Sequence, residues 1–319
     1  MRIALTGSSG LIGTTLVRAL RSDGHDIVRL VRGAATSPDE ISWDPARGTL
    51  DPAVLQDVGA VINLAGAPVG AHRWSAKQKQ LIRSSRVDST TTLSLALAAA
   101  EPRPRLLLSA SAIGWYGDTG ELAVDETTPA GTGFFPSVVR AWEGATVPAE
   151  AAGVRVLHLR TGLVLTSSGG LLGDGVALPG GIDLPLLTIF KLGGGGNLGN
   201  GRQWQSWISL ADEIGAIQFL LAEAEAHDLR GAVNLTGPAP VRNSELTKSL
   251  GRALHRPTLV PVPKAALRLA VGEFADDALA SQRVLPTVLL GAGYIFQHQT
   301  IDQAIDAALH ADAVAGARG

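Results

Sequence analysis

The sequence predicts an α/β fold built on a doubly wound parallel sheet. Short apolar runs alternate with amphipathic stretches of helical length through the first half of the chain, and a glycine-rich turn joins the first run to the first helix. The runs lie at residues 27–31, 60–64, 105–108 and 154–159, with long helical stretches at 75–100 and 137–152. This alternation is typical of βαβ units, and unbroken apolar runs fit strands that are buried on both faces.

The glycine turn predicts a dinucleotide site of the Rossmann type. Residues 3–5 lead directly into Gly7-x-x-Gly10-x-x-Gly13, and an amphipathic helix follows. In that context the first glycine permits a tight turn, the second lets the backbone approach a diphosphate, and the third lets the helix pack on the strand. The helix N-terminus also offers free N–H groups to the phosphates. An ordinary glycine-rich turn is the alternative. We expect cofactor contacts from Gly7, Ser9, Gly10, Leu11, Ile12 and Gly13.

The end of the second predicted strand indicates which nucleotide is preferred. An NAD site usually carries an acidic residue about twenty positions past the glycines. Here the strand ends on Val31-Arg32-Gly33, and the nearest acids, Asp23 and Asp26, precede it. An arginine pairs with the 2′-phosphate of NADP(H), whereas a carboxylate repels it. We therefore expect NADP(H) with Arg32 at the ribose; a solvated arginine at a strand end is the alternative.

The composition argues against several classes of protein. The chain has 319 residues, a formal net charge of -2 and no cysteine. It therefore lacks the basic footprint of a protein that binds nucleic acid or an acidic membrane, and it cannot hold a disulfide or cysteine-ligated zinc. The absence of cysteine fits a cytoplasmic protein. His72, His158 and His298 are scattered through the sequence, so we expect no metal site.

The pattern changes after residue 165, which predicts a second, smaller lobe. Glycine dominates residues 167–201, and we interpret them as a mobile excursion around a short apolar element at 184–192. A strand and a helix return at 207–223, and from Pro238 onward helices predominate. We expect a core from residues 1–165 and 203–236, a mostly helical C-terminal substrate lobe from 166–202 and 237–310, and a frayed tail at 311–319.

Further motifs resemble the extended short-chain dehydrogenase/reductase superfamily, in its branch of sugar-nucleotide epimerases and dehydratases. These motifs are Asn63-Leu64-Ala65-Gly66 and Ser109-Ala-Ser111-Ala-Ile-Gly-Trp-Tyr116-Gly-Asp118. The resemblance implies cofactor contacts from Leu64, Ala65, Gly66 and Ser109.

A more specific resemblance is to the group called epimerase family proteins, which has its own C-terminal module. It is carried by Arg73-Trp74, Ser85-Arg86-Val87, Gly201-Arg202-Gln203-Trp204-Gln205-Ser206-Trp207 and Ala280-Ser281-Gln282-Arg283-Val284-Leu285-Pro286. Several unrelated motifs occur in the expected order, so the match covers nearly the whole chain.

One departure from the superfamily concerns its chemistry. Its members usually use Tyr-x-x-x-Lys, in which the lysine and the cofactor lower the pKa of the tyrosine. With Glu143 at the position of the family's glutamate, the tyrosine position falls on Phe135 and the lysine position on Val139. A phenyl ring carries no transferable proton and valine carries no charge. The usual alcohol–ketone chemistry therefore does not carry over directly.

Replacements for that pair are few. Ser111 stands at the family's catalytic serine position, and Tyr116 is close to the expected nicotinamide end. Asp118 and Glu143 are candidate bases. Each has a structural alternative: Ser111 as a cap or cofactor contact, Tyr116 as a packed aromatic, Asp118 as a turn residue and Glu143 as a member of an ion pair.

Substrate contacts are expected from Arg86, Trp204 and Trp207. Arg86 would orient a carboxylate or phosphate, and the tryptophans would form a wall for a ring-containing small molecule. An ion pair for Arg86 and packing at a domain junction for the tryptophans are the alternatives. The sequence leaves open whether the protein forms a homodimer.

Two functions remain from the sequence: an NADP(H)-dependent oxidoreductase or epimerase-like isomerase, and a protein that binds NADP(H) as a signal without turnover. A third option is hydride transfer to a flavin-like or quinone substrate with little proton transfer.

Overall fold

The computed structural model of the protein has a central sheet of seven strands in the order β13-β7-β5-β4-β1-β2-β3. Every neighbouring pair in this sheet runs parallel. The structure describes residues 1–70, 72–173, 175–178 and 182–316. Because β1 pairs with both β2 and β4, the strand order reverses at β1, and ligands of such sheets bind at the carboxyl ends of the strands there. The expected doubly wound parallel sheet is confirmed.

The strands of the sheet and the helices beside them follow the predicted alternation. The strands are β1 (Arg2–Thr6), β2 (Asp26–Arg32), β3 (Glu40–Trp43), β4 (Ala60–Asn63), β5 (Leu106–Ala112), β7 (Arg155–Thr161) and β13 (Gly231–Leu235). The helices are α1 (Leu11–Ser22), α2 (Ala76–Ala99), α3 (Phe134–Gly144), α4 (Val147–Ala151) and α7 (Leu210–Glu223), with 3-10 turns η1 (Pro52–Leu55) and η2 (Ile113–Trp115). The helix expected at 137–152 is two helices, because Pro148 lies in the first turn of α4, a place suited to a residue without an N–H.

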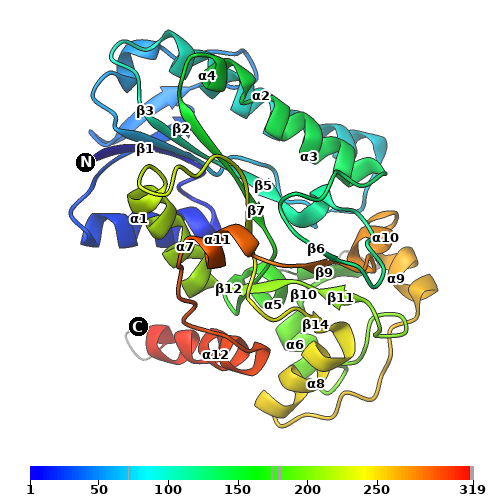
Figure 1. Cartoon of the computed structure of the whole chain (residues 1–319). Helices are drawn as coiled ribbons and strands as arrows, with labels where there is room; N and C mark the ends of the chain where they lie inside the picture. The colour runs from blue at the N-terminus through cyan, green and yellow to red at the C-terminus, as the bar shows by residue number, and fades with distance from the viewer. Residues whose placement is uncertain (71, 174, 179–181, 317–319) are drawn as a thin grey trace.

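Helices cover both faces of the sheet (Figure 1). Ile3 and Leu5 of β1 pack with apolar residues of α1 and α7, whereas Ala4 packs with residues of α2 and α4. Successive strand residues point to opposite faces, so each strand contributes to two cores. This arrangement explains why the strand sequences are apolar without alternation.

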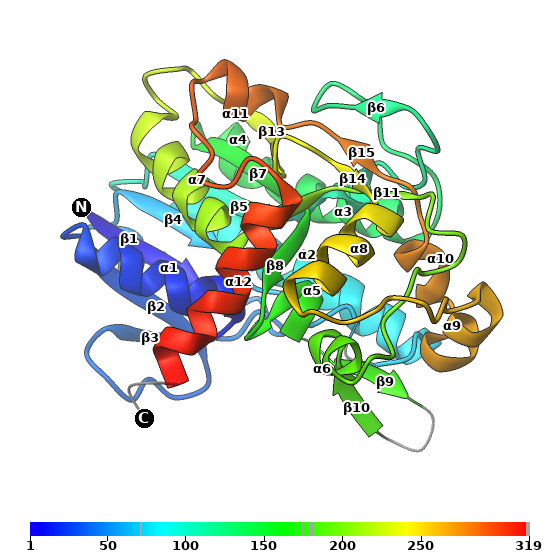
Figure 2. The ribbon, with the colours of Figure 1, turned by 90° about the horizontal axis from the view of Figure 1, so that it is seen from below.

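A second group of short elements packs against the sheet, and Figure 2 shows it beside the core. It contains β6 (Ala123–Val124), β8 (Leu163–Thr166), α5 (Gly170–Gly173), β9 (Gly175–Leu178), β10 (Ile182–Pro185), α6 (Leu186–Lys191), β11 (Trp204–Gln205), β12 (Trp207–Ser209), β14 (Val241–Arg242), α8 (Asn243–Ala253), α9 (Lys264–Val271), α10 (Phe274–Ala278), β15 (Arg283–Val284), α11 (Thr287–Gly291) and α12 (Ile301–Gly316).

The glycine-rich segment contains more regular structure than the sequence predicts. Strands β9 and β10 pair antiparallel, and α6 follows them. Residues 174 and 179–181 of that segment lie outside the described residues. At the other end of the chain α12 extends to Gly316, beyond the start of the expected frayed tail, and residues 317–319 lie outside the description.

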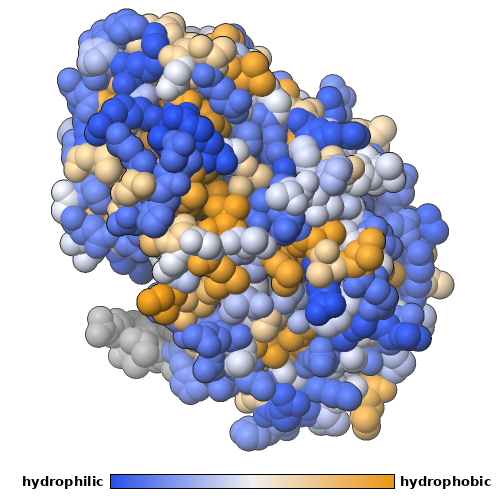
Figure 3. Space-filling model, in the orientation of Figure 1, coloured by the Kyte–Doolittle hydropathy of each residue, from blue (hydrophilic) through white to orange (hydrophobic). Residues whose placement is uncertain are grey.

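The second group has a core of its own, in which β8 and β12 pack with α8 and α12. Polar and apolar residues are mixed over the face drawn in Figure 3, and apolar residues gather near its middle, around α11. Among the described residues, no helix combines the length and the apolar character needed to cross a membrane.

Candidate cofactor and active site

The glycine turn between β1 and α1 has the shape of a diphosphate cradle. Gly7 has a φ of +69°, and a Cβ on it would lie 2.6 Å from the Leu64 carbonyl oxygen. A Cβ on Gly13 would lie 2.1 Å from the carbonyl oxygen of Gly7, so only glycine lets the helix start this close to the turn. Next to Gly10 the nearest contact would be that same carbonyl oxygen, at 3.3 Å. The space beside Gly10 is therefore open to a ligand.

The N-terminus of α1 suits an anion. Its N-cap is Gly10, which has no side chain to bond the first turn, and the first turn carries no acidic residue. The N–H groups of that turn have no partner within the helix, and they form the positive end of the helix dipole. A bound diphosphate would satisfy them.

The loop that follows β4 is fastened to the glycine turn. Thr6 Oγ1 donates to Asn63 Oδ1 at 2.7 Å and accepts from the backbone N–H groups of Leu64 at 3.0 Å and Ala65 at 3.2 Å. The expected contacts at 64–66 thus lie beside the turn. Ser109, another expected cofactor contact, is only 1% exposed and accepts from Asn63 at 3.4 Å. It supports this loop from inside and offers almost no surface to a ligand.

Arg32 is the last residue of β2 and is exposed to solvent. No ion pair or side-chain hydrogen bond engages its guanidinium within the described part of the chain. Since β2 pairs with β1, Arg32 lies one strand away from the glycine turn at the same edge of the sheet. This is the position expected for a contact with the adenosine ribose.

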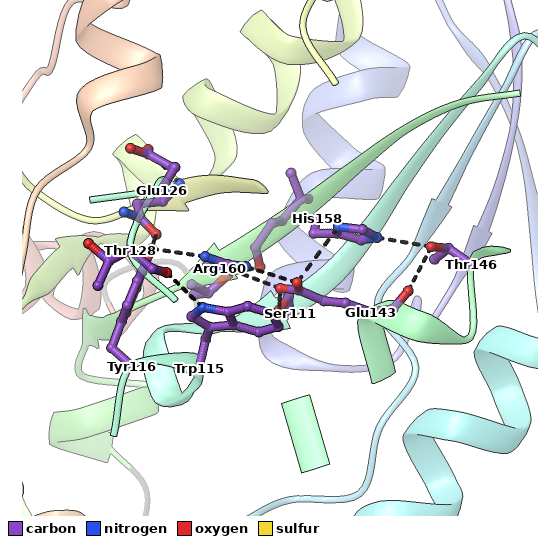
Figure 4. A network of polar contacts seen from close by, with 12 residues as sticks. Ser111, Trp115, Tyr116, Glu126, Thr128, Glu143, Thr146, His158 and Arg160 are labelled. Atoms are coloured by element: carbon purple, nitrogen blue, oxygen red, sulfur yellow. Dashed lines mark hydrogen bonds and ion pairs between the residues drawn. The ribbon is translucent and has the colours of Figure 1, made fainter. Parts of the chain in front are cut away.

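A buried ion pair lies at the ends of β5 and β7 (Figure 4). Arg160 Nε and Nη2 donate to the two carboxylate oxygens of Glu143 at 2.8 and 2.9 Å. The hydroxyl of Ser111 donates to Glu143 Oε1 at 2.6 Å. Because the exposed fractions of the Arg160 and Glu143 side chains are 4% and 8%, this pair is a structural element in which each charge compensates the other.

Tyr116 belongs to the same network. Its hydroxyl donates to Asn234 Oδ1 at 2.8 Å and accepts from Arg160 Nη1 at 3.1 Å, and the residue is 3% exposed. Burial raises the pKa of the phenol, while the nearby Arg160 opposes the rise. Both hydrogen-bonding directions of the hydroxyl are thus occupied, and the geometry favours a packed aromatic over a proton donor to substrate.

The other candidate bases also have structural partners. Asp118 Oδ1 accepts from the backbone N–H groups of Gly120 at 3.0 Å and Ser281 at 3.2 Å, which makes it a turn residue. The phenyl ring of Phe135 lies over Gly114, where a Cβ would come within 2.1 Å of it, and Val139 is fully buried. Ser111 is 4% exposed, and its hydroxyl proton points at Glu143. Its lone pairs remain to accept a hydrogen bond.

The sequence did not point to Arg160, and His158 was considered there only as a metal ligand. His158 Nε2 lies 3.0 Å from Thr146 Oγ1, its Nδ1 lies 3.8 Å from Glu143, and burial lowers the pKa of its imidazole. The register of β5 and β7 pairs Ser111 with Arg160. The available signal was that the charged Arg160 directly follows the apolar run at 154–159.

Arg86 does not form an ion pair with Glu143, because the carboxylate of Glu143 is paired with Arg160. It is 8% exposed, its Nη1 donates to the Ile82 carbonyl at 3.0 Å, and its guanidinium lies 5.0 Å from the ring centroid of Trp142. The alternative of a structural ion pair is therefore wrong for Arg86.

The two tryptophans expected to form a wall are placed differently. Trp207 is 1% exposed and donates from Nε1 to the Ala239 carbonyl at 2.9 Å, so it packs the junction of the two groups of elements. Trp204 is partly exposed, and the guanidinium groups of Arg242 and Arg283 lie 4.1 and 4.6 Å from its ring centroid. Of the two, only Trp204 has surface to offer a ligand.

Comparisons with known proteins place these features in a family context. Residues 3–138 match the model of the NAD dependent epimerase/dehydratase family, and residues 262–308 match a domain of unknown function, DUF1731. Epimerase family protein Mb2239 of Mycobacterium bovis is 45% identical over 304 residues, which cover 95% of this chain and 96% of the relative. The chloroplastic SDR39U1 homolog of Arabidopsis thaliana is 34% identical over 323 residues, with 96% and 86% covered.

A solved structure is also similar over nearly the whole chain. It is the crystal structure of human epimerase family protein SDR39U1 with NADPH, which matches with a TM-score of 0.85 at 28% identity. The match covers 97% of this chain and 99% of the human chain.

Proposed function

The chain belongs to the epimerase family proteins, with the fold of the NAD-dependent epimerase/dehydratase family, and on that premise we propose that it is an NADP(H)-dependent oxidoreductase or epimerase-like enzyme. The observation that carries the proposal is the open space at Gly10 in front of the free N-terminus of α1. That cradle fits a dinucleotide diphosphate. The NADPH in the human relative's structure supports the choice of cofactor.

Different residues at the carboxyl edge of the sheet would bind different parts of the dinucleotide and the substrate. The glycine turn would hold the diphosphate, and Arg32 would pair with the 2′-phosphate. The nicotinamide would supply or accept a hydride. Ser111, at the end of β5, would accept a hydrogen bond from a substrate hydroxyl, because its own proton is directed to Glu143.

A small-molecule substrate would lie between the core and the C-terminal module. Val284 of β15, within the matched module, packs with Ile113 and Tyr116 just beyond Ser111. The neighbouring Arg283 lies over the partly exposed ring of Trp204. The module thus sets the cation of Arg283 against the ring of Trp204, which lies outside the module, and this pairing suits a ring-containing or anionic substrate.

Nucleotide titration tests the cofactor assignment. An arginine–phosphate pair at a partly exposed site contributes roughly 1.5–3 kcal/mol, or about ten- to a hundredfold in affinity. NADPH should bind tighter than NADH by that factor, as measured by nucleotide fluorescence, and the gap should narrow as salt rises. Arg32→Asp should erase or reverse the preference. Equal affinity of the unmodified protein for both nucleotides would refute the NADP(H) assignment.

The second candidate function is an NADP(H) sensor without turnover. Phe135 and Val139 in place of the proton-transferring pair, and the buried phenol of Tyr116, favour it. NADPH oxidation would be followed against a panel of aldehydes, ketones and quinones, with Ser111→Ala as the control. Oxidation that depends on Ser111 supports the enzyme. Tight NADPH binding with no oxidation by any member of the panel supports the sensor.

A further inference from the structure

Arg86 and Arg160 are both buried near the carboxyl ends of the strands, but among the residues that the structure describes only Arg160 has a counter-charge. Arg160 is bonded to Glu143 and to the hydroxyl of Tyr116. Among the described residues, Arg86 has one hydrogen bond, from Nη1 to the Ile82 carbonyl, and its buried Nε has no partner. Within the described part of the chain, no carboxylate lies within ion-pair distance of its guanidinium.

A buried cation without a partner costs free energy, because desolvation is not repaid by a nearby anion. Burial lowers the pKa of Arg86 to about 10, so the guanidinium is still charged at neutral pH. The ring of Trp142 at 5.0 Å offers a cation–π contact. That contact offsets only part of the desolvation. The position therefore calls for an anion that the described chain does not supply.

The guanidinium faces the loop beside the glycine turn. A Cβ on Gly66 would lie 3.3 Å from Arg86 Cζ and 3.4 Å from its Nη2. This loop is the one that Thr6 holds against the glycine turn. Since β4 pairs with β1 on the side opposite β2, Arg86 and Arg32 flank the turn from its two sides.

We propose that Arg86 provides the counter-charge for the diphosphate of the bound dinucleotide. This inference rests on the proposed function. A dinucleotide with its 2′-phosphate at Arg32 passes its diphosphate over the glycine turn and continues toward β4 and β5. The anion that then comes nearest to Gly66 and Arg86 is the diphosphate. Arg32 would bind the 2′-phosphate, which NADPH carries and NADH lacks, whereas Arg86 would bind the diphosphate, which both nucleotides carry.

Arg86→Met tests the assignment, because methionine keeps an unbranched side chain and removes the charge. We expect the Kd values of NADPH and NADH to rise by the same factor, about ten- to a hundredfold for a lost charge-assisted contact. Adenosine 2′-monophosphate, which has no diphosphate, should bind as before by calorimetry. Arg83→Met removes an exposed arginine from the same helix. It should leave both nucleotide affinities nearly unchanged.

Thermal unfolding without nucleotide separates a ligand-binding arginine from a structural one. Arg86→Met should not lower the unfolding midpoint of the free protein, because it removes an uncompensated buried charge. It should reduce the upward shift of that midpoint caused by NADPH. A lower midpoint of the free protein with an unchanged NADPH shift would overturn the proposal.

Other results of the nucleotide titrations would also test the role proposed for Arg86. If Arg86→Met leaves the Kd values of both nucleotides unchanged, Arg86 binds a substrate anion or has a structural role, and the proposal is wrong. If only the affinity for NADPH falls, Arg86 binds the 2′-phosphate, and the proposal is also wrong. If the unmodified protein binds neither nucleotide, the proposed function fails first. Should Arg86→Met not fold, Arg86→Lys takes its place, with the same but smaller loss expected for NADH and NADPH.

Discussion

Glu213 of α7 gives the protein a pH-dependent stability that one substitution should remove. The residue is 1% exposed, and its Oε1 accepts from Thr161 Oγ1 at 2.9 Å. Its Oε2 has no partner in the described part of the chain. Burial raises the pKa of its carboxyl from 4.5 to about 8, and the bond from Thr161 opposes only part of the rise. The folded protein therefore keeps a proton at neutral pH that the unfolded chain has lost.

The sign of the effect follows from this difference in proton binding. The contribution of Glu213 to the free energy of unfolding is fully present below pH 4.5. It declines as the pH rises toward about 8, where the carboxyl of the folded protein ionises. Over that window the free energy of unfolding falls by about 1.4 kcal/mol per pH unit. At pH 7 the buried carboxyl thus costs roughly 3 kcal/mol relative to pH 4.5.

Glu213→Gln keeps the shape and the acceptor for Thr161 but cannot ionise. Urea unfolding at pH 5.5, 6.5 and 7.5 should show the variant gaining on the unmodified protein by about 1.4 kcal/mol per pH unit. Glu225→Gln is the matched control, since Glu225 is an exposed carboxylate just beyond the same helix. Its difference from the unmodified protein should stay nearly constant. Parallel pH profiles for the unmodified protein and Glu213→Gln would refute the reasoning.

Three further substitutions test the turn and the network. Gly13→Ala should abolish nucleotide binding, measured by fluorescence, because its Cβ would lie 2.1 Å from a backbone oxygen of the turn; unchanged affinity would show that the turn can move. Glu143→Gln should lower the free energy of unfolding by about 3–5 kcal/mol, because it leaves Arg160 uncompensated, and a loss below about 1 kcal/mol would contradict the buried pair. Tyr116→Phe should lower the free energy of unfolding by about 1–3 kcal/mol, because the buried Asn234 and Arg160 each lose a hydrogen bond, and it should leave the affinity for NADPH unchanged. A large loss of NADPH affinity would instead show that Tyr116 contacts the ligand.

Much of the core could be predicted because its signals are local. Strands β2, β4, β5 and β7 lie within a few residues of the apolar runs, and the glycine spacing locates the turn without any long-range contact. Strand β3 was missed because Glu40–Trp43 is only four residues long and only Trp43 is buried. Such a short strand takes its stability from pairing with β2, which the local pattern does not show.

The partners of buried charges were not predictable in the same way. The sequence presented Glu143 and Arg86 as candidates for ion pairs. The register of β5 and β7 sets Arg160 beside Ser111, and Glu143 of α3 pairs with that arginine, so that Arg86 has no carboxylate partner among the described residues. Glu213 gave no signal, since a glutamate in an amphipathic helix normally faces solvent. Register and helix rotation decide these contacts, and both depend on the whole sheet.

The directions of the hydrogen bonds at Ser111 limit the chemistry of the site. Its hydroxyl donates to Glu143, and the same carboxylate accepts two bonds from Arg160. Any proton that Ser111 takes from a substrate must displace its own proton onto Glu143. The adjacent guanidinium opposes that transfer, because it favours the ionised carboxylate. With Phe135 and Val139 in place of the usual pair, the site has weak means of moving a proton and an intact cradle for a nicotinamide nucleotide. For the proposed enzyme, hydride transfer to an acceptor that needs little protonation by the protein, such as a quinone, would demand less of this arrangement than alcohol–ketone interconversion.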